Sequence, residues 1–151
     1  MKTQFTLPSL WLGAALLLGS CQRIASDPEP NSTSKLLNTR WLLKQVDERP
    51  VAVSSYPPDY DSYLQFVETG NQVRGLATCD ALQGQFTLVA GTQQLTISQL
   101  NVAQSSCAVP YTANRYLAAL PQTSRYEISG DLLRLYDAQA AQPRLIFQAA
   151  P

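Results

Sequence analysis

Short segments in which apolar and polar residues alternate recur through most of this chain. Alternation with period two places the apolar side chains on one face of a β-strand. The segments are 36–46, 63–67, 85–89, 95–98, 125–128, 132–136 and 144–148. Turn-forming residues such as Gly70-Asn71, Gly91 and Gly130 separate them, and such short connections favour hairpins. The sequence therefore predicts a mainly β domain of about seven or eight short antiparallel strands.

Residues 111–120 depart from this pattern, because Ala113, Tyr116 and Leu120 have helical spacing and Pro121 follows them. We expect one helix of about ten residues there. A sheet with one apolar face leaves no long exposed edges if it curls into a small barrel with the helix covering one end. The predicted inward residues are Trp41, Leu43, Leu64, Phe66, Phe86, Leu88, Leu95, Ile97, Tyr126, Ile128, Leu133, Leu135, Leu145 and Phe147.

The amino end has the features of an export signal. Lys2 precedes an apolar run at 10–19, which is too short to cross a bilayer. The run ends in Leu18-Gly19-Ser20-Cys21, which resembles the lipobox of bacterial lipoproteins. We expect lipidation of Cys21 by acyl chains such as palmitate, which would hold the protein on a membrane. Ordinary signal cleavage, with Cys21 left as a thiol, is the alternative.

The expected organisation is a signal peptide at 1–20, a disordered tether at 21–35 and one domain at 36–151. The tether is polar and contains two prolines. Gln22 follows the lipidated cysteine where aspartate would retain many lipoproteins at the inner membrane. The expected location is therefore the bacterial cell envelope, with the outer membrane favoured.

The chain contains no histidine, which excludes Ser-His-Asp triads, Cys-His pairs and histidine zinc sites. Its 11 acidic residues are scattered, and its 11 basic residues form no cluster that could follow a phosphate backbone. We therefore predict no catalytic residues, no cofactor, no metal and no nucleic-acid partner.

Two cysteines remain after Cys21 is assigned to the lipid. An even remainder in an exported chain indicates a disulfide between Cys79 and Cys107. The alternatives are two unpaired buried cysteines or a reactive thiol at Cys79, which would lack a histidine to activate it.

The segment 56–63 is rich in tyrosine and proline. Tyr56, Tyr60 and Tyr63 form a candidate partner-binding loop, because exposed tyrosines offer flat amphipathic surface. The alternative is a stiff loop that packs its own rings.

Several motifs, in this order, resemble the META domain of the HslJ heat-shock-protein family over about residues 36–149. They are Tyr63-Leu64-Gln65-Phe66, Gly70-Asn71-Gln72-Val73-Arg74-Gly75, Cys79-Asp80, Gly84-Gln85-Phe86-Thr87-Leu88, Leu95-Thr96-Ile97, Cys107, Tyr116-Leu117-Ala118-Ala119-Leu120, Tyr126-Glu127-Ile128-Ser129-Gly130-Asp131-Leu132-Leu133-Arg134-Leu135 and Phe147. Thr78-Cys79-Asp80 stands where the family usually has Gly-Cys-Asn, and the run that ends at Cys107 also departs from the family pattern. The resemblance implies a small barrel-like fold, a link to heat shock or envelope stress, and no established catalytic activity.

Three functions are consistent with these observations. The first is a lipid-anchored, non-catalytic META-domain protein that acts in the envelope, either by stabilising another component or by binding an envelope protein partner through its loops. The second is a protein that binds or inhibits an extracellular hydrolase through the tyrosine-rich loop. The third is a carrier of a small apolar ligand inside the barrel, which the bulky inward residues disfavour.

Overall fold

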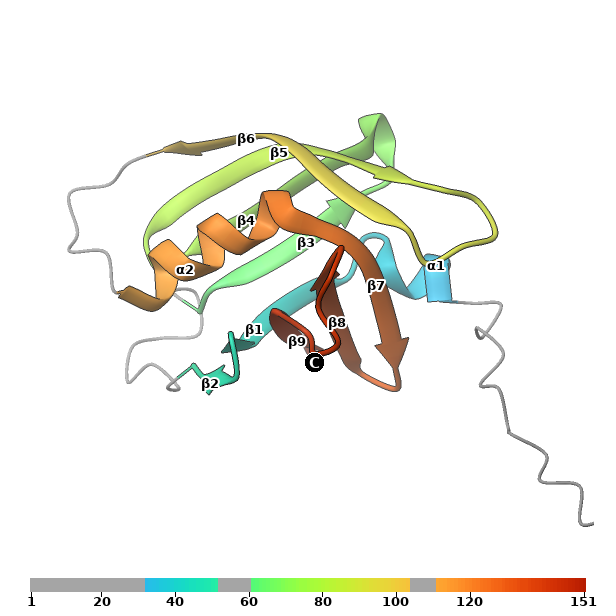
Figure 1. The fold of residues 1–151 in the computed structure, drawn as a ribbon. Helices are drawn as coiled ribbons and strands as arrows, with labels where there is room; N and C mark the ends of the chain where they lie inside the picture. Colours follow the sequence, from blue (N-terminus) through green and yellow to red (C-terminus); the bar gives the residue numbers. More distant parts are fainter. Residues whose placement is uncertain (1–31, 52–60, 104–110) are drawn as a thin grey trace, which may run out of the picture.

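The computed structural model describes residues 32–51, 61–103 and 111–151 (Figure 1). Its helical elements are α1 (Ser32–Leu36), α2 (Tyr111–Ala119) and the 3-10 turns η2 (Thr69–Asn71) and η3 (Leu120–Gln122). Its strands are β1 (Arg40–Val46), β2 (Arg49–Pro50), β3 (Tyr63–Val67), β4 (Gln72–Ala77), β5 (Asp80–Leu88), β6 (Leu95–Ala103), β7 (Thr123–Ser129), β8 (Leu132–Asp137) and β9 (Leu145–Ala149).

The strands form one antiparallel sheet that curls into a half-barrel, with α2 lying across its open side (Figure 1). The strand order is β6-β5-β4-β3-β1-β9-β8-β7, and the short β2 pairs only with β1. The two ends of this order meet where Gln94 bridges Arg125 and the Tyr126 N–H donates to the Gln93 carbonyl at 2.9 Å. The predicted mainly β, barrel-like fold with a helix is confirmed.

The interior of the half-barrel is filled with large side chains. Trp41, Phe66, Tyr116, Tyr126 and Phe147 are each at most 1% exposed. Phe66 and Phe86 meet edge to face with ring centroids 5.3 Å apart, and Tyr116 and Phe147 do so at 6.0 Å. This geometry is favourable for aromatic pairs. Helix α2 thus contributes to the same core as the sheet.

The sequence predicted most of these elements correctly. The segment 63–67 coincides with β3, the segments 125–128 and 132–136 lie within β7 and β8, and the helix 111–120 is α2 with the start of η3. Of the predicted inward residues, Leu88 and Ile128 are only partly buried, and the others are buried.

Strand β4 is absent from the sequence prediction. Its inward positions are Val73, Gly75 and Ala77, and two of these carry little or no side chain. The alternation of apolar bulk was therefore too weak to be recognised.

The start of the domain also differs from the prediction. The expected strand at 36–46 begins only at Arg40, and the last residues of the expected tether form α1. Leu36 at the end of α1 is fully buried, and its carbonyl accepts a hydrogen bond from the Trp41 indole at 3.1 Å. This contact draws the end of the tether onto the core.

Two glycines stand where the backbones of neighbouring strands approach closely. A Cβ atom at Gly75 would lie 2.2 Å from the Tyr63 carbonyl oxygen on the neighbouring strand, and one at Gly84 would lie 2.8 Å from the Ser98 oxygen. The register between β5 and β6 shifts at Gly84, which marks a β-bulge.

We predict that Gly75→Ala lowers the free energy of unfolding by more than about 2 kcal/mol, because the added methyl group meets backbone that cannot move freely. Gly91→Ala is the matched control. Gly91 has a φ of 73° but open space around it, so the control should lose only about 1 kcal/mol from backbone strain. Denaturant unfolding measures both values, and equal losses would contradict the steric explanation.

Candidate functional site

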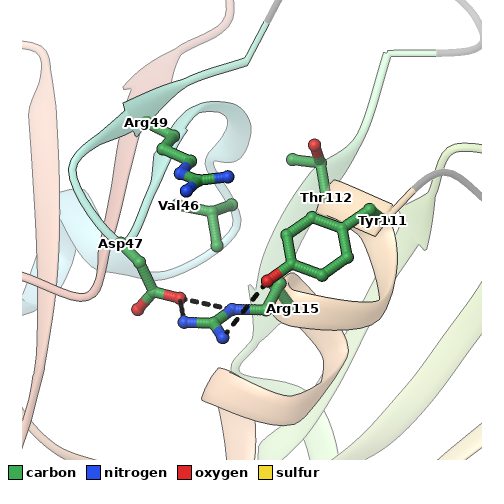
Figure 2. A pocket seen from close by; sticks show the side chains of 6 residues that line it. All are labelled: Val46, Asp47, Arg49, Tyr111, Thr112 and Arg115. Carbon is green, nitrogen blue, oxygen red and sulfur yellow. Dashed lines mark hydrogen bonds and ion pairs between the residues drawn. The ribbon is translucent and has the colours of Figure 1, made fainter.

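A half-open pocket of about 240 Å³ lies between the β1–β2 turn and the first turn of α2 (Figure 2). The residues that line it are Val46, Asp47, Arg49, Tyr111, Thr112 and Arg115. Residues from two distant parts of the sequence therefore form its two walls.

The β1–β2 turn positions one wall. Val46 pairs with Arg49, which leaves Asp47 and Glu48 as a two-residue loop. Both loop residues have positive φ, 44° and 64°. This is the backbone of a type I′ turn, whose twist matches that of a hairpin, and aspartate tolerates it well. The turn therefore places both Asp47 and Arg49 in the lining of the pocket.

Asp47 binds two arginines from distant segments. Its Oδ2 accepts hydrogen bonds from Arg115 Nε at 2.7 Å and from Arg115 Nη2, and its Oδ1 accepts one from Arg144 Nε at 2.5 Å. Burial raises the pKa of Asp47, but the hydrogen bonds from both guanidinium groups outweigh it, and the net pKa is lowered. The Asp47 carboxylate in turn raises the pKa of Arg115. Asp47 and Arg115 therefore form a charged pair at neutral pH.

Arg144 extends this network to the loop after β8. Its Nη1 donates to Asp137 Oδ2 at 3.2 Å. The Asp137 Oδ1 accepts the N–H groups of Gln139 and Ala140 at 3.0 and 2.7 Å. These bonds, with that to Gln139 contributing most, lower the pKa of Asp137. The network joins the β1–β2 turn, α2, the start of β9 and the end of β8.

This arrangement favours binding of anions over proton transfer. A carboxylate whose pKa is held low is a poor general acid or base at neutral pH. Within the described residues there is no group of three His, Cys, Asp or Glu side chains able to hold a metal ion. The chemistry that the pocket offers is that of guanidinium, hydroxyl and phenol groups.

Of the predicted partner-binding tyrosines, the structure describes Tyr63. Tyr56 and Tyr60 lie outside the described residues. Tyr63 begins β3, where the Arg40 guanidinium lies 4.1 Å from the centre of its ring, and its carbonyl accepts the Tyr116 hydroxyl at 3.0 Å. Tyr63 therefore contributes to the sheet and to the attachment of α2.

The lipidation site and one end of the predicted disulfide also lie outside the described residues, at Cys21 and Cys107. Cys79 lies in the turn between β4 and β5 and is half-buried. The disulfide between Cys79 and Cys107 stays a prediction.

Thr78, beside Cys79, has a φ of 60°. A β-branched residue rarely adopts this left-handed conformation, whereas glycine does so without strain. This is the position at which the family pattern has glycine. Asp80, which follows, begins β5 and is only 4% exposed.

Sequence reasoning did not identify the residues of the pocket. Asp47-Glu48 between Val46 and Arg49 was a usable signal for a two-residue turn. However, Asp47 is 68 residues from Arg115 and 97 from Arg144. No local pattern connects residues so far apart.

The comparisons with known proteins identify the family. The family model described as META domain matches residues 34–151. The chain therefore belongs to the META domain family. Among curated proteins, none matches the chain.

Solved structures share the fold. An NMR structure of a protein from Burkholderia xenovorans is 24% identical, with a TM-score of 0.61, over 95% of this chain and 99% of that one. A second NMR structure is 21% identical, with a TM-score of 0.55, over 76% of this chain and 92% of that one.

In the described part of the chain, no helix has the length and apolar character needed to span a membrane.

We predict that Asp47→Asn lowers the free energy of unfolding by about 1–2 kcal/mol at neutral pH, because two guanidinium groups lose their anionic partner. The pKa of Asp47 is lower in the folded protein than its ordinary value of 3.8. The stabilisation is therefore fully present above 3.8 and is lost as the pH falls through the lowered folded-state pKa.

Urea unfolding of both proteins over this pH range measures the effect. Glu48→Gln removes an exposed carboxylate from the same turn and is the control, with an expected change within about 0.5 kcal/mol. A difference between wild type and Asp47→Asn that stays constant at the acid end would contradict the assignment.

We predict that Thr78→Gly raises the free energy of unfolding by about 1 kcal/mol, because it removes strain at a positive φ. Thr87→Gly, at an exposed position in β5, is the control and should lower stability by about 0.5–1 kcal/mol. Chemical denaturation of the two variants tests this, and destabilisation by both would show that Thr78 is not strained.

Proposed function

We propose that the protein is a lipid-anchored, non-catalytic META-domain protein of the bacterial cell envelope. The observation that carries this proposal is the sequence Leu18-Gly19-Ser20-Cys21 at the end of a short apolar run, in a chain whose residues 34–151 match the META domain. Acyl chains on Cys21 would attach the domain to a membrane through a polar tether. Gln22 favours the outer membrane where the source has two membranes.

A non-catalytic role is supported by how the charged side chains are used. Asp47 and Asp137 are ion-paired with arginines. Glu127 accepts the Tyr136 hydroxyl at 2.9 Å and lies 3.5 Å from Arg134. These carboxylates stabilise turns and strands, and the pKa values of both aspartates are held low. Such groups fit a binding or structural role better than acid–base catalysis.

The partner we propose is an envelope protein, and the link to heat shock or envelope stress comes from the resemblance to the HslJ family. The alternative of a hydrolase inhibitor acting through three tyrosines is weakened, because Tyr63 is half-buried within β3 and stacked under Arg40. The alternative of an apolar-ligand carrier is weakened by the aromatic side chains that fill the interior.

The test is metabolic labelling of the full chain in a bacterial host with an alkyne-tagged palmitate. We predict that the wild-type protein carries the label in the membrane fraction and that Cys21→Ser loses it, since the thiol of Cys21 is the acceptor. A variant with both Cys79→Ser and Cys107→Ser is the matched control. It retains the lipobox and should keep the label.

Intact-mass spectrometry of the membrane-extracted protein then locates the adduct. A mature chain that begins at residue 21 with a fatty modification supports the proposal. An unmodified residue 21 at the amino end, or label that persists in Cys21→Ser, would overturn it.

A further inference from the structure

The pocket beside the β1–β2 turn carries more positive than negative charge. Of its lining residues Arg49 and Arg115 are cationic, and only Asp47 is anionic. Both oxygens of Asp47 already accept hydrogen bonds from guanidinium groups. A cation entering the pocket would therefore meet two arginines and a carboxylate that is already neutralised. These charges favour an anionic ligand.

Arg49 supplies the second guanidinium group that lines the pocket. Within residues 32–51, 61–103 and 111–151, the side chain of Arg49 makes no ion pair, hydrogen bond or ring contact. It points across Val46 towards α2 (Figure 2). Its backbone is fixed by pairing with Val46 in the turn. The planar fork of a guanidinium group matches a carboxylate, which can accept two parallel hydrogen bonds from it.

The opposite wall presents further donors in fixed positions. Asp47 binds Nε and Nη2 of Arg115, and this leaves Nη1 directed at the Tyr111 hydroxyl, 3.5 Å away. Figure 2 shows Arg115 held between Asp47 and Tyr111. The Thr112 side chain lines the same wall. A ligand carboxylate would thus have hydrogen-bond donors on both sides.

The pocket also offers apolar surface. Tyr111 is 63% exposed, although its side chain is large and mostly apolar. Val46 adds an aliphatic side chain to the lining. An exposed aromatic ring beside unpaired positive charge is a common feature of binding surfaces. A ligand with both a carboxylate and a flat apolar part would use all of these groups.

We propose that this pocket binds a carboxylate carried on a small aromatic or apolar body. The pocket has a volume of about 240 Å³, whereas sites for drug-sized ligands typically measure about 300–1,000 Å³. The pocket therefore suits a ligand with a single small ring or apolar group. The carboxylate can belong to a free organic acid or to the carboxyl terminus of a peptide. This inference goes beyond the proposed function and does not depend on the lipid anchor.

The test is a titration of the ¹⁵N-labelled protein, followed by NMR. Benzoate is the first probe, and benzamide is its neutral counterpart of the same shape. We expect benzoate to give saturable shifts of the amide signals of Arg49, Tyr111 and Arg115, and benzamide to give none. The absence of saturable shifts with benzoate would overturn the proposal, as would equal binding of benzamide.

Variants show whether Arg49 is responsible. Arg49→Gln should weaken benzoate binding about tenfold, because it removes one charged hydrogen-bonding partner. Arg74→Gln is the matched control, since Arg74 is an exposed arginine on β4 whose partner is Gln65. It should bind benzoate as the wild type does. Equal affinities in all three proteins would overturn the assignment of the pocket.

Two further probes define the ligand. A short peptide that ends in phenylalanine with a free carboxylate is compared with its carboxyl-terminal amide. Tighter binding of the free-acid peptide than of benzoate would identify a peptide terminus as the source, and the reverse would identify a small acid. Inorganic phosphate is the last probe, and phosphate binding as tight as that of either carboxylate would overturn the specificity for carboxylates.

Discussion

Strand β1 is the element on which the half-barrel depends, because it joins two runs of strands within the one sheet. β3 to β6 follow one another as a meander, and so do β7 to β9. β1 connects them by pairing with β3 on one side and β9 on the other, whereas their far ends meet through the bridge between Gln94 and Arg125. Its inward Trp41 is buried between the two halves and is fixed by a hydrogen bond to the carbonyl of Leu36. The first strand of the domain therefore determines how the rest of the chain closes around the core.

The turn at the end of β1 also connects distant parts of the chain, here through ion pairs at the surface. Asp47 connects the turn to α2 through Arg115 and to the residue that precedes β9 through Arg144. The backbone adds a further connection, since the Asp47 N–H donates to the Arg144 carbonyl at 2.9 Å. Exposed ion pairs contribute little one by one, but a partly buried network with paired guanidinium groups contributes more. The same network leaves Arg49 and Tyr111 facing one pocket, so that stability and a binding surface arise from one set of contacts.

These features support the proposal that the domain presents a binding surface. The largest side chains fill the interior, and the described carboxylates discussed above are committed to arginines, a tyrosine and backbone N–H groups. The proposed anchor at Cys21 would keep this surface close to a membrane, and the proposed carboxylate pocket would give it a specific ligand. The two proposals rest on different parts of the chain and are tested separately.

The sequence by itself determined the local structure. Period-two alternation located β3, β7, β8 and β9, and helical spacing located α2. Glycines at positions 70, 91 and 130 marked turns with positive φ. The sequence did not show β4, whose inward Gly75 and Ala77 lack bulk. At Gly75 the backbone of β3 approaches too closely for a side chain. The pocket was decided only by the tertiary structure. Its charged residues Asp47 and Arg115 lie 68 positions apart in the chain, and only the curl of the sheet, with α2 packed on it, brings them within hydrogen-bonding distance.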